Sequence, residues 1–538
     1  MKNIEIPLQS EKSKRYRFFE MLPALLTYSL ILLPVLLSIF TPVYAAYFII
    51  GYMIIWLFKA VAMSVRVVQG YQQIQRYQRY DWERLLSDVA SPDAAREALQ
   101  RYKNDKGMQW HYRNLSLQEG QLEAIDPKDL IHAVIIPTYN EGIDVLEPTI
   151  ESVLASNFPM KQVIFILAYE ERGGSQVERN AKALVDKYRD RFMEAFAVKH
   201  PDGMANEVIG KGGNATFAGK FLAQYVADQA IAPSRVIVTT LDSDNRPHPG
   251  YLAALSYAYV IHDDPVHTTF QPVPLYTNNI WDAPAPMRVI ATGNSFWMVI
   301  TSLRPHLLRN FSSHAQSLQA LIDTDFWSVR TIVEDGHQFW RTYFRYDGQH
   351  DVVPLFIPIY QDAVLASGYV KTLREQFIQL RRWAWGASDV AYVLEKGYFQ
   401  KNKVSKFDLT MKLARLIEGH VSWATAPLIL AFAAWLPLFV NPHADRSFLA
   451  HQLPVVASRI QTVAMFGVFI TMFLSLKLLP PMPARYKARR RVYMILQWVY
   501  MPVTSIVYTA FSALNSQTRL LFGRYLDKFD VTEKAVKK

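Results

Sequence analysis

The sequence predicts an α/β domain built on a mostly parallel sheet and joined to apolar helices long enough to span a membrane. Residues 132–244 alternate apolar strand-like runs with helical patterns. On either side of the domain lie apolar runs of roughly the ~20 residues that a bilayer-spanning helix needs. The chain of 538 residues is 51% hydrophobic, yet it carries a formal charge of +11. This combination is typical of a polar domain fused to membrane spans.

The first part of the chain, residues 1–65, predicts a transmembrane hairpin. Residues 22–40 and 44–65 are apolar, and Pro42 separates them. No small-residue cleavage site follows the first run, so we expect it to remain as a span rather than to be removed as a signal peptide. Lys and Arg cluster at 12–17 and 66–84, and such clusters mark the cytoplasmic ends of spans. We therefore expect a multi-pass protein of the plasma (inner) membrane with a cytoplasmic domain.

The positive charge has two possible explanations, a nucleic acid or a membrane surface. Its clusters at 12–17, 66–84 and 485–491 all lie beside apolar runs, and the sequence has no nucleic-acid-binding motif. The lipid bilayer is therefore the expected partner, and nucleic acid is not. The sequence has no cysteine, which excludes disulfides, thiolate metal sites and a cysteine nucleophile.

The middle of the chain carries the α/β domain. Residues 66–130 are polar and rich in Tyr, Gln and Arg, which predicts an amphipathic cytoplasmic connector near the membrane surface. Residues 131–370 predict the domain itself, with strands at 132–137, 162–168, 194–198 and 235–241 and helices near 144–155, 175–192 and 213–229. Residues 245–370 are less regular and contain many Pro and aromatic residues.

The last part of the chain returns to the membrane. Residues 371–400 predict an interfacial amphipathic helix, and 401–515 a membrane region with apolar stretches at about 416–440, 456–479 and 492–514. The basic residues at 487–491 should be cytoplasmic, and the loop at 441–452 external. A single crossing by the last stretch would place the basic tail, 516–538, outside. We therefore expect a bend at Pro502 that returns the tail to the cytoplasmic side.

Two aspartates close the apolar run at 235–241. Side chains at positions i and i+2 of an extended segment point the same way, so Asp242 and Asp244 can reach one divalent cation or its waters. In open α/β sheets, ligands collect at the carboxyl ends of the strands, where this pair would lie. The alternative is a pair of aspartates that caps the next helix.

Further polar groups follow other strands. Thr138, Tyr139 and Glu141 end the first strand, where they could hydrogen-bond and stack on a nucleoside. The alternative is a helix N-cap that uses Asn140 and Glu141. Glu170 ends the second strand and could accept hydrogen bonds from a nucleoside or lie in a solvated loop. Lys211 precedes two glycines and a helix, so it could offer an ammonium group and backbone amides to a phosphate, although Gly-rich turns are common.

Two segments lie later in the chain. Glu334 and Asp335 follow an apolar run and could supply a general base, or could be acids that stabilise a helix N-terminus. Gln379, Arg382 and Trp383 lie in the amphipathic segment. Arg382 can neutralise a diphosphate leaving group, and Trp383 can present a flat face to a sugar ring. Anchoring of an interfacial helix by Arg and Trp is the alternative.

Taken in this order and flanked by spans, the segments resemble the motifs of membrane-integrated family-2 glycosyltransferases, the group that contains cellulose, chitin and hyaluronan synthases. The resemblance covers about residues 130–400 and the spans around them. It rests on P-T-Y-N-E at 137–141, D-x-D at 242–244, E-D at 334–335 and Q-x-x-R-W at 379–383. Residues 292–295, which include Gly293, resemble the acceptor-side Gly motif of the family more loosely.

The resemblance implies a GT-A (Rossmann-like) glycosyltransferase domain that uses a nucleotide sugar, with UDP as the expected nucleotide. It implies that Asp242 and Asp244 hold Mg²⁺ or Mn²⁺, and that Asp335, beside Glu334, removes the proton of the acceptor hydroxyl in an inverting transfer. Trp383 and Gly293 would contact a glycan or lipid-linked acceptor. The nucleotide sugar would be bound by Thr138, Tyr139, Glu141, Glu170, Lys211, Asp242, Gln379 and Arg382.

Two features depart from the family pattern. The second strand of the family usually ends in aspartates that contact uracil, whereas this chain has Tyr169, Glu170 and Glu171. Few spans follow the domain, which weakens the case for polymer secretion. Two other functions therefore remain open: transfer of one sugar to a lipid or lipid-linked acceptor, and an inactive nucleotide-binding membrane scaffold.

Overall fold

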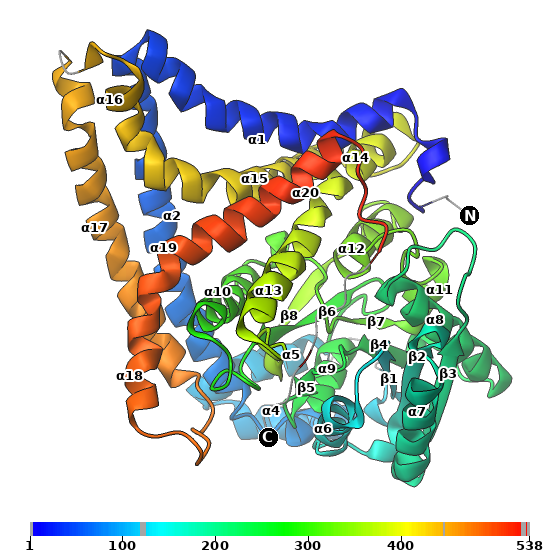
Figure 1. Cartoon of the computed structure of the whole chain (residues 1–538). Helices are drawn as coiled ribbons and strands as arrows, with labels where there is room; N and C mark the ends of the chain where they lie inside the picture. The colour runs from blue at the N-terminus through cyan, green and yellow to red at the C-terminus, as the bar shows by residue number, and fades with distance from the viewer. Residues whose placement is uncertain (1–3, 119–124, 445–446, 529–533, 535–538) are drawn as a thin grey trace.

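The computed structural model describes residues 4–118, 125–444, 447–528 and 534. Parts of the expected connector, external loop and basic tail, at 119–124, 445–446, 529–533 and 535–538, lie outside the described residues. Figure 1 shows an α/β domain, coloured cyan to yellow-green, beside long helices from both ends of the chain, coloured blue and yellow to red. The expected combination of an α/β domain with long apolar helices is confirmed.

A mixed sheet of eight strands forms the centre of the domain. The strands are β1 (Ile131–Thr138), β2 (Val163–Glu170), β3 (Glu194–His200), β4 (Val236–Thr240), β5 (Arg246–Pro247), β6 (Thr269–Leu275), β7 (Ala315–Ser317) and β8 (Val352–Tyr360). Their order across the sheet is β3-β2-β1-β4-β7-β6-β8-β5. The strands β1 to β4 pair in parallel, and β7 runs antiparallel to both β4 and β6. The strand β8 is parallel to β6 and antiparallel to β5.

Helices cover both faces of the sheet because its central strands are apolar on both sides. Successive strand side chains point to opposite faces. In β1, Val134 and Ile136 pack into one buried cluster, and Ala133 and Ile135 pack into another. The first cluster is closed by α6 (Ile143–Leu154), α7 (Ser175–Tyr188) and α9 (Tyr251–Val260), and the second by α8 (Lys211–Asp228) and α11 (Leu318–Asp323).

The four parallel strands confirm the sequence prediction, whereas β5 to β8 were not predicted. Pro272 and Pro274 lie in β6, and Pro354 and Pro358 lie in β8. Proline cannot donate to a strand ladder, so a Pro-rich run is not expected inside a sheet. Here the ladder accommodates the prolines with a register shift between Pro272 and Val273. Three further helices complete this half of the domain: α10 (Ala285–Ser302), α12 (Glu334–Arg345) and α13 (Tyr369–Ala384).

The expected surface connector is in fact part of the core of the domain. The second helix runs on to Tyr77, well beyond the expected end of the hairpin at residue 65. The helices α3 (Trp82–Ser87), α4 (Pro92–Tyr102) and α5 (Gln109–Gln118) follow it. Trp82, Leu85 and Leu115 are buried in the same cluster as Val134 of the sheet. The aromatic residues of this region therefore pack against the sheet.

Within the described residues, five helical stretches are long and apolar enough to cross a membrane by their length and composition. The first four contain α1 (Lys14–Phe40), α2 (Pro42–Tyr77), α15 (Lys406–Phe432) followed by α16 (Leu436–Val440), and α17 (Phe448–Lys477). The turns after α1 and α16 meet, because the Asn441 side chain donates to the carbonyl oxygens of Ser38 and Ile39, at 3.2 and 2.9 Å. From this end, α2 and α17 run side by side to the α/β domain (Figure 1).

The fifth stretch begins and ends on the side of the α/β domain. It comprises α18 (Arg489–Leu496), α19 (Met501–Thr504) and α20 (Phe511–Leu521), joined by irregular helical turns. At its start, Arg490 donates to the carbonyl oxygen of Trp281, and at its end Arg17 donates to the carbonyl oxygen of Leu521, at 2.7 Å. Beyond it, Lys534 contacts Asp244 of the domain. The described part of the tail therefore lies on the domain side, as the expected bend requires.

Candidate active site

The carboxyl ends of β1 and β2 are joined by the first turn of α8. Asn214 is buried, and its side-chain amide donates to the carbonyl oxygens of Thr138 and Ala168, at 3.2 and 2.9 Å. Buried backbone carbonyls need such partners. Asn214 thus fixes the start of α8, with Lys211 at its first position, beside the strand ends where ligands of open α/β sheets collect.

Glu141 organises the loop after β1. One carboxylate oxygen accepts hydrogen bonds from the hydroxyl of Thr138 at 2.7 Å and from the amide of Tyr139 at 2.9 Å. The other accepts from the hydroxyl of Ser243 at 3.1 Å. Burial would raise the pKa of Glu141, but Lys534 and these hydrogen bonds outweigh it and lower the pKa. The next helix begins at Ile143 without a side-chain cap, so Glu141 ties β1 to the segment after β4 instead of capping α6.

The two groups expected to contact a nucleoside after β1 and β2 are linked by Arg172. The Arg172 guanidinium donates to the carboxylate of Glu170 and lies 4.0 Å from the centre of the Tyr139 ring. Glu170 is buried. The aromatic ring, the cation and the carboxylate therefore form one unit at this end of the sheet. Sequence analysis did not single out Arg172, although its place two residues after Glu170 was a usable signal.

Asp242 and Asp244, the expected metal ligands, are both paired with lysines. Lys211 lies 2.6 Å from Asp242, and Lys534 lies 2.7 Å from Asp244. Burial would raise the pKa of Asp242, but Lys211 and Lys534 outweigh it and hold the pKa well below its usual range. Asp242 therefore stays ionised and attracts cations.

These carboxylates suit a divalent metal that shares its coordination with a ligand. Among the described residues, no group of three His, Asp or Glu side chains is arranged to hold a metal by itself. Mg²⁺ is commonly held by one or two carboxylates together with substrate phosphates and waters. Asp242 and Asp244 match that donor set, and the ammonium group of Lys534 shows that a cation is accommodated between Asp244 and Ser243.

Lys534 was not among the expected site residues. Its ammonium group donates to the hydroxyl of Ser243 and to Asp244, both at 2.7 Å, and its backbone forms an isolated parallel bridge with Leu365. Burial would lower the pKa of Lys534, but Asp244 and Glu141 outweigh it and raise the pKa. Lys534 and Asp244 are 290 residues apart in the sequence, so no local pattern signals this contact.

Glu334 and Asp335 occupy the first turn of α12 and lie against α8. Burial and the neighbouring Asp335 raise the pKa of Glu334 to about 8. The Asp335 carboxylate accepts the amide of Gly336 at 2.7 Å. A Cβ on Gly212 would lie 2.5 Å from the carbonyl oxygen of Ser328 and 3.1 Å from Cβ of Glu334. The glycine after Lys211 is thus required because α8 begins in close contact with the Glu334 segment.

Tyr276, which follows β6, joins these separate segments. Burial, Asp242, Asp244 and Asp335 raise the pKa of its hydroxyl, and Arg382 acts in the opposite direction. Its ring centre lies 6.2 Å from that of Trp383. The charges of these three predicted carboxylates and of the predicted arginine therefore all act on one phenol. Sequence analysis missed Tyr276 because β6 itself was not predicted.

The remaining predicted residues lie on α13 and α10. The side chain of Gln379 accepts a hydrogen bond from Gln376 at 3.0 Å, and Trp383 packs beside Tyr276. Gly293 is an exposed residue in the middle of α10, and nothing lies within 4 Å of a Cβ built there. In the same segment, Ser295 accepts the amide of Tyr276 at 3.0 Å. The structure thus links this segment to the site through Ser295.

Comparisons with known proteins give distant structural likenesses. No protein-family model matches the sequence, and no curated protein matches it. The mannosyltransferase PcManGT from Pyrobaculum calidifontis, solved with GDP-Man and Mn²⁺, aligns with a TM-score of 0.39 at 13% identity, covering 81% of this chain and 100% of that chain. TarS of S. aureus aligns with a TM-score of 0.33 at 13% identity, covering 62% and 55%.

A third likeness is to GalNAc-T7 with UDP, GalNAc and Mn²⁺, with a TM-score of 0.33 at 11% identity, covering 54% of this chain and 58% of that chain. The solved structures named here are thus similar to parts of this chain at low identity.

Proposed function

We propose that this chain is a membrane-bound, metal-dependent, inverting glycosyltransferase that transfers a sugar from a nucleotide sugar to a glycan or lipid-linked acceptor. The observation that supports it best is that the charges of Asp242, Asp244, Asp335 and Arg382 all act on the hydroxyl of Tyr276. These residues come from three segments of the chain. Asp242 and Asp244 follow β4, Asp335 lies at the start of α12, and Arg382 lies near the end of α13. Together they supply carboxylates for a cation, a separate carboxylate base and a guanidinium for a leaving anion.

Asp242 and Asp244 would hold Mg²⁺ or Mn²⁺ through their carboxylate oxygens. The metal supplies positive charge that stabilises the diphosphate as it departs. Lys211 adds a second cation from the first position of α8, where the positive end of the helix dipole also favours an anion. The nucleoside would lie against Tyr139 and Glu170, with Thr138 and Glu141 shaping the loop and Gln379 alongside. Thr138 and Glu170 are buried, which limits the access of water to this part of the donor.

Asp335 would act as the base, because its partner Glu334 keeps a proton near neutral pH. Burial and Asp335 raise the pKa of Glu334 to about 8. The acceptor oxygen forms a bond to the anomeric carbon while the bond from that carbon to the phosphate oxygen breaks. The hydroxyl proton moves to Asp335, and the electron pair leaves with the diphosphate, which Arg382 helps to neutralise. Attack from the opposite face inverts the anomeric configuration.

Trp383 would position the acceptor sugar beside the base, as its place next to Tyr276 allows. The five apolar stretches would anchor the protein in the bilayer with the basic ends of its helices on the side of the α/β domain. A growing polysaccharide and a single sugar on a lipid-linked carrier both fit these residues as products.

A screen of radiolabelled UDP- and GDP-sugars on membranes that contain the protein tests the proposal. Transfer that requires Mn²⁺ or Mg²⁺ is expected for the wild type and is expected to fall at least about 100-fold in Asp242→Asn. Asp325→Asn is the matched control, because Asp325 is an exposed carboxylate paired with Lys220 on the surface. Product sizing separates chain growth from single transfer. Equal transfer by Asp242→Asn and the control, or no transfer from any donor, would contradict the proposal.

A further inference from the structure

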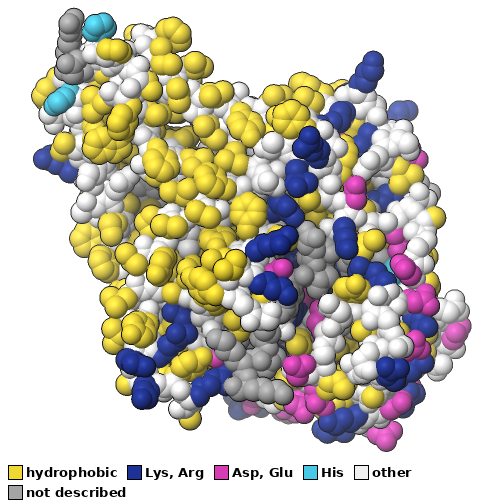
Figure 2. All heavy atoms as spheres, viewed as in Figure 1, with side chains coloured by type: hydrophobic (Ala, Val, Ile, Leu, Met, Phe, Trp, Pro, Cys, Tyr) yellow, Lys and Arg dark blue, Asp and Glu magenta, His cyan; other side chains and the backbone are white. Residues whose placement is uncertain are grey.

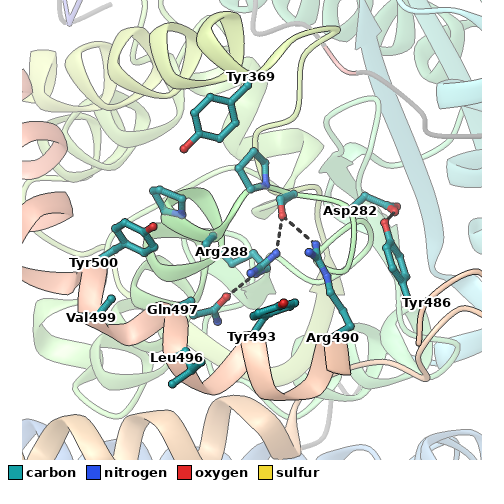
Figure 3. Close-up of a pocket in the computed structure, with 14 residues that line it drawn as sticks. Asp282, Arg288, Tyr369, Tyr486, Arg490, Tyr493, Leu496, Gln497, Val499 and Tyr500 are labelled. Atoms are coloured by element: carbon teal, nitrogen blue, oxygen red, sulfur yellow. Dashed lines mark hydrogen bonds between the residues drawn. The ribbon is translucent and has the colours of Figure 1, made fainter. Parts of the chain in front are cut away.

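A second pocket lies apart from the proposed active site, between the start of α10, the start of α13 and α18 (Figure 3). Its volume is about 570 Å³. Arg288 and Arg490 line it together with the aromatic rings of Tyr369, Tyr493 and Tyr500. Arg490, which belongs to the basic cluster at 485–491 beside a predicted membrane segment, thus lines a defined cavity.

The two guanidinium groups in this pocket are short of negative charge. Arg288 is only 2% exposed and donates to the carbonyl oxygen of Ala283 at 2.8 Å, and Arg490 approaches the same oxygen at 3.4 Å. Figure 3 shows both side chains turned towards this one carbonyl. Burial and the neighbouring Arg490 lower the pKa of Arg288 to about 10.

No carboxylate of the described pocket lining is left to neutralise them. Asp282 is the one acidic residue among the described residues of the wall, and it accepts hydrogen bonds from Arg485 at 2.8 and 2.7 Å. It also accepts the hydroxyl of Tyr486 at 2.5 Å. Nε of Arg490 is buried and has no hydrogen-bond partner in the described part of the chain. A buried donor without a partner favours a bound anion that can accept from it.

The other wall of the pocket is apolar and opens towards the membrane-facing surface. Tyr493, Leu496 and Val499 are 50%, 60% and 75% exposed, although they belong to a stretch apolar enough to span a membrane. Hydrophobic side chains cover the long-helix part of the molecule in Figure 2, and Lys and Arg gather at its border with the domain. A ligand that pairs with the arginines of one wall and packs on the apolar side chains of the other needs an anionic head and an apolar tail.

We propose that this pocket binds an anionic phospholipid of the leaflet next to the α/β domain. The phosphate lies between Arg288 and Arg490, and an acyl chain runs along Tyr493, Leu496 and Val499. A bidentate guanidinium contact suits a phosphodiester. The exposed apolar wall would contact an acyl chain favourably, but it offers no favourable contact to a free phosphate. The bound lipid would hold α18 against the loop that leads from Tyr276 to α10, and so would brace the border between domain and membrane.

Native mass spectrometry of the full chain in detergent, titrated with phosphatidylglycerol or phosphatidylcholine, tests the proposal. We expect tighter binding of phosphatidylglycerol to the wild type, and binding weakened about tenfold or more in Arg490→Gln. Arg491→Gln removes the same charge from the next residue, which is exposed and does not line the pocket, and is expected to bind as the wild type does. An excess of inorganic phosphate should not displace the lipid.

Three results would overturn the lipid assignment. They are equal affinity for the two lipids, equal binding by Arg490→Gln and Arg491→Gln, and displacement by inorganic phosphate, which would assign the pocket to a soluble anion. Tyr493→Glu covers the case in which Arg490→Gln does not fold, because Tyr493 is half exposed and a carboxylate there repels a lipid phosphate. Tight binding of phosphatidylglycerol by a folded Tyr493→Glu protein would also refute the proposal.

Discussion

The two carboxylate pairs of the proposed active site differ in the charges that surround them. Asp242 and Asp244 are each paired with a lysine, whereas among the described residues no Lys or Arg lies within ion-pair distance of Glu334 or Asp335. The pKa of Asp242 is accordingly held low by Lys211 and Lys534 against the effect of burial. The pKa of Glu334 is raised to about 8 by burial and by Asp335. One pair is thus suited to hold a cation, and the other to hold and accept a proton.

The largest expected effect separates the two members of the second pair. Asp335→Asn removes the base and should lower the transfer rate by about 10²–10⁴-fold. Glu334→Gln replaces a carboxyl that is already protonated near pH 7, so its rate should fall less than about tenfold. Steady-state transfer at pH 7 measures both. Equal losses of rate in the two variants would show that Asp335 is not the base with Glu334 as its protonated neighbour.

The second prediction concerns the phenol between the pairs. Tyr276→Phe keeps the ring beside Trp383 but removes the hydroxyl on which the charges of Asp242, Asp244 and Asp335 act. The loss of this polar group from the site should lower kcat/KM about tenfold. Tyr257→Phe, which removes a buried hydroxyl on the other side of the sheet, is the control for stability. An unchanged kcat/KM in Tyr276→Phe would place the reacting groups elsewhere.

The third prediction tests whether Lys534 competes for the first pair. Lys534→Gln removes the ammonium group that lies 2.7 Å from Asp244, so the Mn²⁺ concentration for half-maximal nucleotide binding should fall about three- to tenfold. Lys528→Gln removes the same charge from an exposed position of the tail and should leave the Mn²⁺ requirement unchanged. Isothermal titration measures both. The competition is refuted if the two variants need the same Mn²⁺ concentration.

The smallest expected effect is on stability. The folded pKa of Glu334 is raised from 4.5 to about 8, so the stability contributed by its protonated form is complete below pH 4.5 and is lost as the pH rises through about 8. Glu334→Gln does not titrate. Between pH 5 and pH 9, the Tm of the wild type should therefore fall by a few degrees relative to the Tm of Glu334→Gln. Parallel Tm profiles would show that Glu334 is not buried as described.

The sequence predicted those parts of the molecule that depend on local pattern. Strands β1 to β4 and the carboxylates at their ends follow from short apolar runs and i, i+2 spacing. The strands β6 and β8 were not predicted because their prolines break that pattern. Tyr276 was not predicted as a site residue because it follows β6. Arg172 and Lys534 were not predicted as site residues, because an ion pair depends on which segments the fold brings together. The same holds for the helices at 82–118, whose aromatic residues pack on a sheet rather than on a bilayer.

The most direct test of the division between the two pairs is Mn²⁺ binding in the presence of UDP or GDP, followed by electron paramagnetic resonance of free Mn²⁺. Asp244→Asn should lose nucleotide-dependent Mn²⁺ binding by about tenfold or more, and Asp335→Asn should retain it. The matched pair differs only in which carboxylate is removed. Retained binding in Asp244→Asn, or lost binding in Asp335→Asn, would contradict the assignment of metal to the end of β4 and of proton transfer to the start of α12.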